Sequence, residues 1–240
     1  MFGIETIRRC EQIVAVGFLF IYTAISATSC SGEVRFSTDS DAPHTYTEFV
    51  HVLAEADGGA NTEEPIAITF DGTETALMLY AALARAGKYV ALDLSESSVT
   101  GFGDGDASNP LGLSYIVSIV LPNNLTRIGS KAFEGCVNLR EVLIPNSVTE
   151  IGEYAFHACT SLTKIPIPAS VTYIDRDAFS QCKALVTVVL AGDTRLADNT
   201  VFPDGAAFRA VAAQSEAFST GTYQAARGTY QHIETNWRRL

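Results

Sequence analysis

Apolar and polar residues alternate in short runs along the middle of the chain, and a proline closes each run. In one run Leu162, Ile165 and Ile167 are spaced to face a core, and Pro168 follows them. This pattern predicts a short, half-buried β-strand that ends at the proline. The apolar residues after the proline are more widely spaced, which predicts a turn and a compact non-strand segment before the next strand begins.

The whole unit repeats at a step of 23 residues. Four residue types mark this step: Phe133, Phe156 and Phe179; Cys136, Cys159 and Cys182; Leu139, Leu162 and Leu185; and Pro122, Pro145 and Pro168. A period in this range indicates a solenoid of stacked units rather than one globule around a central core. Because equivalent residues of successive turns then stack, we expect the phenylalanines and the cysteines to form buried ladders inside the coil.

Written as one motif, the repeat reads C-x-x-L-x-x-I-x-I-P-x-S-V-T-x-I-G-x-x-A-F-x-x-C. It resembles the BspA-like, or treponemal-type, leucine-rich repeats, closely over residues 88–192 and more loosely on either side. The resemblance implies an α/β solenoid, a leucine-rich-repeat horseshoe whose concave face is a parallel β-sheet of about six strands. It also implies the cell-surface role in adhesion or in binding host proteins that is common in this family, and it implies no catalysis.

The repeat also predicts how the chain is divided. Residues 122–192 carry the regular repeats, and residues 65–121 carry degenerate ones, in which strand patterns begin at Ile116, Tyr89 and Ile66. These patterns and the regular repeats together account for the expected number of strands.

Segments with helical patterns flank the repeats. Residues 30–64 form an acidic segment whose helix, at 45–56, would cover the first turn, and a second helical pattern ends at Gly87. Residues 193–240 would form the C-terminal cap. This cap is predicted to contain a helix at 206–217 and then a hairpin, because G-T-Y recurs on both sides of Arg227 and Gly228.

Charge is placed unevenly along the chain. Residues 31–110 contain 14 acidic and 3 basic residues, whereas residues 111–240 contain 11 of each. We interpret the acidic end as a source of solubility that shields the end of the solenoid. The net charge of −11 argues against nucleic acid or an anionic membrane surface as a partner.

The first 29 residues have the pattern of an export signal. Arg8 and Arg9 precede an uncharged apolar run at 13–25, and small residues follow it. That order of basic, apolar and small-residue regions is typical of a secretory signal. A membrane-spanning helix is the alternative, but it needs about 20 apolar residues, and this run is shorter.

Cys30 follows Thr28 and Ser29, in the position where a bacterial lipoprotein signal places the cysteine that receives lipid. Ala27 stands where most of these signals have leucine. Two interpretations remain open. Lipidation of Cys30 would anchor the exported chain through two acyl chains, at the cell surface, the outer membrane or the periplasmic side; ordinary cleavage after Ser29 would leave Cys30 unmodified.

The sequence carries no recognisable metal, cofactor or catalytic motif. The three cysteines of the repeats lack C-x-x-C pairs and nearby paired histidines, so we interpret them as structural thiols rather than zinc ligands. The loop at 101–110 begins like a calcium loop but lacks its terminal glutamate, and calcium binding there stays open. With no nucleophile elbow, phosphate loop or paired carboxylates, we predict no enzyme and no cofactor.

Two positions of each predicted strand face outward, on the concave side. The first set is Ser118, Glu141, Lys164 and Thr187, with Arg140 just before Glu141, and the second set is Val120, Leu143, Pro166 and Val189. The apolar second set reflects either strand propensity or an interaction site. All of these residues except Ser118 are candidate ligand contacts.

Two functions are consistent with these patterns. The first is a surface or envelope protein that binds another macromolecule, such as a host or matrix protein, through its concave sheet. The second is a non-adhesive structural or scaffolding lipoprotein of the envelope that docks a partner of the same cell. In either case the membrane would be reached only through the N-terminal lipid anchor.

Overall fold

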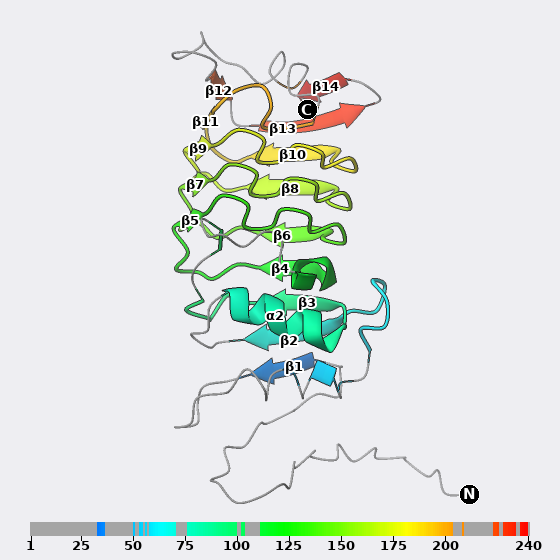
Figure 1. Cartoon of the computed structure of the whole chain (residues 1–240). Coiled ribbons are helices and arrows are strands. Elements are labelled where there is room, and N and C mark those ends of the chain that lie inside the picture. Colours follow the sequence, from blue (N-terminus) through cyan, green and yellow to red (C-terminus); the bar gives the residue numbers. More distant parts are fainter. Residues whose placement is uncertain are drawn as a thin grey trace, which may run out of the picture.

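The computed structural model describes residues 33–36, 50, 53–54, 56, 58–70, 76–99, 102–103, 111–203, 208, 223–225, 228–233 and 236–239. These residues stack as successive turns of one column, with β1 toward one end and β14 toward the other (Figure 1). The predicted export signal, Cys30 and most of the segment 30–64 lie outside the described residues, as do most of the loop 101–110 and of the helix 206–217.

One side of the column is built from what we call the long-strand sheet. Its strands are β1 (Glu33–Phe36), β2 (Ile66–Phe70), β3 (Val90–Asp93), β4 (Ile116–Val120) and β6 (Glu141–Leu143), followed by β8 (Lys164–Ile167), β10 (Thr187–Leu190), β13 (Gly228–Ile233) and β14 (Asn236–Arg239). The strands from β1 to β6 pair in parallel, and so do β8 and β10, where Thr187 lies opposite Lys164, one 23-residue step earlier. The prediction of a solenoid with a parallel sheet is therefore confirmed.

A second sheet, the short-strand sheet, runs along another side of the column and is parallel except for its last pair of strands (Figure 1). It contains β5 (Arg127–Ile128), β7 (Glu150–Ile151), β9 (Tyr173–Ile174), β11 (Thr194–Leu196) and β12 (Tyr223–Ala225). The prediction of a non-strand segment at the residues of β5, β7 and β9 was wrong. A strand of two residues is too short to show alternation, so only pairing with neighbouring turns identifies it.

Helical structure covers the degenerate repeats. The helix α2 (Ala76–Ala86) joins β2 to β3, and the short 3₁₀ helix η1 (Leu111–Tyr115) leads into β4. α2 buries Ala76, Leu79, Tyr80, Ala82 and Leu83. Gly87 ends it as predicted: its φ is +64°, and its N–H donates to the Leu83 carbonyl at 3.0 Å.

The C-terminal strands differ from the predicted hairpin. β12 pairs with β11 in the short-strand sheet, whereas β13 pairs with β10 in the long-strand sheet. The strands on either side of Arg227 and Gly228 therefore do not pair with each other, and the hairpin predicted there is wrong. Each strand instead extends the open end of a different sheet. Among the described strands, β13 and β14 follow each other in the chain and pair antiparallel, as the two strands of a hairpin do.

Stacked phenylalanine rings fill the interior between the two sheets. The rings of Phe133 and Phe156 lie 5.1 Å apart, and those of Phe156 and Phe179 lie 5.2 Å apart, each pair almost parallel. Phe202 and Phe102 continue this ladder at its two ends. Neither ring was predicted as part of the ladder, although Phe202 lies one more 23-residue repeat step beyond Phe179 and so carries the same signal.

Main-chain hydrogen bonds also join successive turns outside the two sheets. The N–H of Phe133 donates to the Ala155 carbonyl, and the N–H of Phe156 donates to the Ala178 carbonyl, both at 2.7 Å. Backbone groups that would otherwise be buried without partners are satisfied in this way. Each turn is therefore fastened to the next at several places around its circumference.

In the segments between a short strand and the next long strand, some residues adopt left-handed backbone conformations, and these recur in successive repeats. Gly135, Ala158 and Gln181 occupy equivalent places with φ between 58° and 73°. A residue with a Cβ costs about 1–2 kcal/mol there. The conformation aims the N–H groups of Gly135 and Ala158 at carbonyls of the next turn, at 2.8 and 2.9 Å.

Replacing Phe156 by alanine tests the ladder. Phe156 is fully buried between two other rings, so Phe156→Ala should cost about 3–5 kcal/mol of unfolding free energy. Because each turn contacts mainly its neighbours, the urea transition should also broaden. Val137→Ala, which truncates a side chain that is 41% exposed, is the control. A loss below about 1 kcal/mol for Phe156→Ala would contradict a close-packed ladder.

Candidate functional site

The outward side of the long-strand sheet brings the predicted contact residues together. Strands β4, β6, β8 and β10 place Ser118, Glu141, Lys164 and Thr187 in one line, which we call the polar row, and Val120, Leu143, Pro166 and Val189 in a second line, the apolar row. The inward residues between them, such as Val142, Ile165 and Val188, are fully buried. On each of these strands, the residues that face inward and those that face outward are therefore the ones that the sequence predicted.

The apolar row is accessible to a partner. Leu143 is 51% exposed and Pro166 is also exposed, while Val120 and Val189 are half-buried. Beside them, Glu141 and Lys164 of the polar row are exposed. Apolar side chains that lie contiguously on a surface and are bordered by charged residues are typical of an interaction site.

Polar residues close the apolar row at both ends. Asp93 of β3 lies opposite Val120, and Thr229 of β13 lies opposite Val189. Next to Thr229 on the same strand, Gln231 lies opposite Thr187 of the polar row. The apolar row therefore extends from β4 to β10 and does not continue into β3 or β13.

Pro166 interrupts the hydrogen-bond ladder beneath this surface. The carbonyls of Thr163 and Ile167 accept from N–H groups in and beside β10, so Pro166, which alternates with them, faces β6. Proline has no N–H to donate there. The two hydrogen-bonded parts of the long-strand sheet accordingly separate between β6 and β8. These strands remain neighbours in the column (Figure 1).

Arg140 is engaged by another part of the chain. Its guanidinium forms an ion pair with the Glu63 carboxylate and a hydrogen bond to the Thr62 hydroxyl at 3.1 Å. The hydrogen bond and the charge of Arg140 lower the pKa of Glu63. This contact fastens the loop before β2 to a turn more than 70 residues later. Arg140 thus borders the rows as a structural residue.

On the short-strand sheet, an ion pair and a cation–π contact join side chains of neighbouring strands. Arg127 pairs with Glu150 of the next turn at 3.3 Å, and the Arg195 guanidinium lies 5.4 Å from the centre of the Tyr173 ring. The outward side chains of successive short strands thus contact one another. This side presents no apolar row among its described residues and is the weaker candidate for binding.

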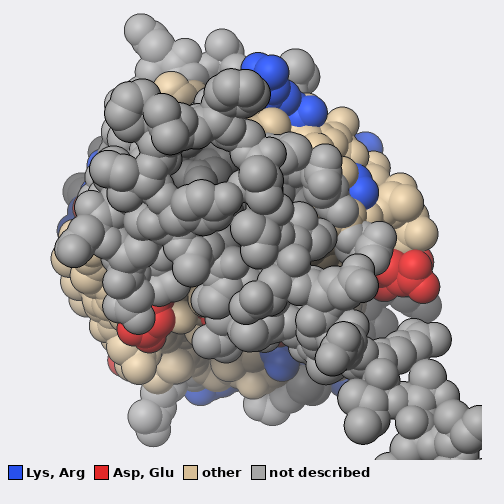
Figure 2. All heavy atoms as spheres, turned by 90° about the horizontal axis from the view of Figure 1, so that it is seen from below, with Lys and Arg blue, Asp and Glu red and all other residues tan. Residues whose placement is uncertain are grey.

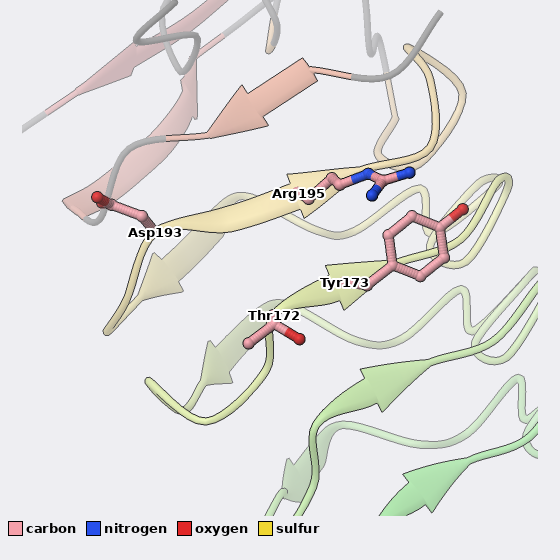
Figure 3. A pocket seen from close by; sticks show the side chains of 4 residues that line it. All are labelled: Thr172, Tyr173, Asp193 and Arg195. Carbon is pink, nitrogen blue, oxygen red and sulfur yellow. The ribbon is translucent and has the colours of Figure 1, made fainter. Parts of the chain in front are cut away.

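A depression of about 470 Å³ lies on the same sheet and is lined by Thr172, Tyr173, Asp193 and Arg195. Figure 3 shows the Arg195 guanidinium beside the Tyr173 ring, whereas the Asp193 carboxylate points away from both. The polar groups therefore do not converge on one point, as they would in a site built to hold a small molecule.

The three cysteines are stacked and buried, as predicted. The thiol of Cys159 donates to the Phe133 carbonyl at 3.2 Å, and that of Cys182 donates to the Phe156 carbonyl at 3.1 Å. Burial raises the pKa of Cys159, and the contact with the Cys159 thiol together with burial raises that of Cys182. Neutral thiols of this kind pack as small apolar groups and are poor nucleophiles.

A histidine and a serine meet on the loop side of the column. His157 Nδ1 lies 2.6 Å from the Ser180 hydroxyl oxygen. That hydroxyl donates to the Asp177 carbonyl at 3.0 Å, so its proton is directed away from the imidazole. The pair joins two turns and lacks the arrangement of a nucleophile with its general base.

The end of the column near β1 shows no single-signed surface on its described residues. Viewed along the column from this end, Lys and Arg and also Asp and Glu appear at scattered places around the rim (Figure 2). Within the described ranges, no three histidine, cysteine or carboxylate side chains are grouped to bind a metal. None of the described helices has the length and apolar character needed to span a membrane.

These features define the class of the protein. Stacked turns of about 23 residues, with a parallel strand, an apolar interior and a phenylalanine ladder in each, are those of a leucine-rich-repeat solenoid. Residues 112–221 match the family described as the BspA type leucine rich repeat region, in 6 copies. Residues 112–221 therefore carry BspA-type leucine-rich repeats, and the resemblance seen in the repeat motif is confirmed over them.

Several solved structures resemble parts of the chain. The leucine rich repeat protein TpLRR of T. pallidum is 30% identical over 49% of this chain and 53% of its own, with a TM-score of 0.39. A leucine rich cell surface protein of Faecalibacterium prausnitzii is 22% identical over 56% of this chain and 41% of its own, with a TM-score of 0.34. A leucine-rich repeat protein of Bacteroides ovatus is 25% identical over 55% of this chain and 43% of its own, with a TM-score of 0.32.

The chain spans about half of the length of these proteins or less. Because the TM-scores are low, assignment to the class rests on the family match and on the geometry of the turns. A search of the curated proteins finds no match.

Thiol labelling tests the buried cysteine ladder. Cys136, Cys159 and Cys182 should resist a thiol reagent in native buffer at pH 8 and react together once urea unfolds the repeats, since each is buried and two have raised pKa values. A variant with Cys10 and Cys30 replaced by alanine removes the remaining thiols. Rapid labelling of that variant in native buffer would show that the interior is open to solvent.

Proposed function

We propose that this protein is an exported surface or envelope protein that binds another protein through the apolar row of its long-strand sheet. The apolar row, together with Glu141 and Lys164 beside it, is the observation that supports this function. A host or matrix protein is the partner that the family resemblance favours, and a partner of the same cell is the alternative. The binding surface would be the same in both cases.

The composition of the face favours a protein partner. Leu143 and Pro166 can be buried by apolar side chains, and Glu141 and Lys164 can set the orientation of a partner through charge. The described outward residues of the long-strand sheet include no aromatic side chain on which a sugar ring or a base could stack. The net charge of −11 also disfavours nucleic acid.

Lipid anchoring at Cys30 is part of the same proposal. The basic, apolar and small-residue regions that precede Cys30 favour export, and two acyl chains on one residue are enough for stable anchoring. No enzymatic step is part of this function, because a non-catalytic binding role accounts for the repeats.

Substituting Leu143 tests the binding surface. A partner is first isolated from host matrix proteins and from envelope extracts with the purified chain. Leu143→Asp should then weaken its binding at least tenfold, because a buried carboxylate would replace an apolar contact near the centre of the row. Isothermal titration calorimetry measures the change, and an unchanged unfolding transition shows that the fold is intact.

Val137→Asp is the matched control, because it introduces the same charge at another exposed apolar residue, outside both rows. It should bind the partner as the wild type does. If Leu143→Asp also binds as the wild type does, the apolar row is a product of strand propensity and the proposed binding surface is wrong.

Replacing Cys30 tests the anchor independently. In cells that process bacterial lipoproteins, Cys30→Ala should abolish labelling by a fatty-acid analogue and move the protein out of the detergent phase. Cys10→Ala, within the predicted signal, is the control and should keep both properties. If the Cys30→Ala protein still partitions into detergent, another feature holds the chain at the membrane and the lipid anchor is wrong.

A further inference from the structure

The spacing of the apolar row restricts the shape of what can cover it. Its four residues lie on successive strands of one column, and neighbouring strands are about 4.8 Å apart, so the row is about 14 Å long and runs along the column. Asp93 and Thr229 lie opposite its terminal members. A partner that uses the whole row must therefore present apolar groups in a line, roughly one per strand spacing.

An α-helix has nearly this spacing, and an extended chain does not. One face of a helix returns every turn, about 5.4 Å along its axis, whereas side chains on one face of an extended chain recur every 6.6–6.8 Å or so. Over the three intervals of the row, the side chains of a helix lying along the column move out of register with the strands by about 2 Å in total. The side chains on one face of an extended chain move out of register by about 6 Å, which is more than one strand spacing.

The charges of the polar row complement a helix laid in this direction. Glu141 and Lys164 are exposed on neighbouring strands, beside Leu143 and Pro166. A helix whose apolar face covers the apolar row carries flanking residues that also recur at each turn. One basic flanking residue can therefore meet Glu141, and an acidic residue one turn later can meet Lys164.

We infer that the partner presents an amphipathic α-helix of about three turns, laid along the column over the apolar row. Its apolar residues follow the spacing i, i+3 or i+4, i+7 and i+10 or i+11. A basic and an acidic residue on one flank face Glu141 and Lys164. This inference rests on the proposed function and specifies the chemistry of its partner.

Two peptide-display libraries of equal diversity test the inference against the full-length protein. One randomises surface positions along three turns of a stable helical scaffold, and the other displays a randomised extended strand. Leu143→Asp and Val137→Asp proteins are used in parallel to identify binders that depend on the apolar row. We expect binders from the helical library that carry the apolar spacing above, lose at least tenfold in affinity to Leu143→Asp, and keep their affinity to Val137→Asp.

The charge contacts are tested with the selected helices. Lys164→Glu should weaken them severalfold, and exchanging the helix's acidic flanking residue for lysine should recover the loss. Failure of this exchange to recover affinity would overturn the predicted charge pairing. Leu143-dependent binders drawn from the extended library would overturn the helical partner and leave the proposed function standing. If neither library yields a binder that depends on Leu143, both the inference and the proposed binding surface fail.

Discussion

Main-chain hydrogen bonding between successive turns is the interaction on which the rest of this structure depends. It joins residues one repeat apart in two parallel sheets and in the segments between them, as with the N–H of Phe156 and the carbonyl of Ala178. Because every turn is held in the same register, equivalent side chains lie directly above one another. Phe156 therefore meets Phe133 and Phe179 and packs as one step of a continuous ladder.

The same register builds the interior and the candidate binding surface together. A strand that buries Val142 necessarily turns Leu143 outward, and the neighbouring turns then add Pro166 and Val120 to the same line. The apolar row is thus a consequence of stacking, and its chemistry is free to vary without disturbing the core. Variation at outward positions on a rigid column is how repeat proteins can acquire different partners.

Two residues on or beside the outward face of the long-strand sheet, Pro166 and Arg140, depart from the regular pattern of the repeat. Pro166 removes a donor from the β6–β8 boundary while adding an apolar side chain to the surface. Arg140, placed next to the rows by the repeat, is instead drawn to Glu63 of the loop before β2. Pro166 leaves the apolar row continuous, and the ion pair between Arg140 and Glu63 joins the segment before β6 to the loop before β2. Neither places a group with catalytic chemistry on the surface.

By itself the sequence determined the solenoid, the phase of each long strand and the ladders of phenylalanine and cysteine, because a 23-residue repeat forces equivalent residues to stack. It also identified both outward rows, since alternation within a strand is a local property. Only the tertiary structure decided that the short strands form a sheet, which strands β12 and β13 pair with, and that Arg140 pairs with Glu63. These features depend on contacts between distant turns, and neither a two-residue strand nor a lone charged side chain carries a local pattern that predicts its partner.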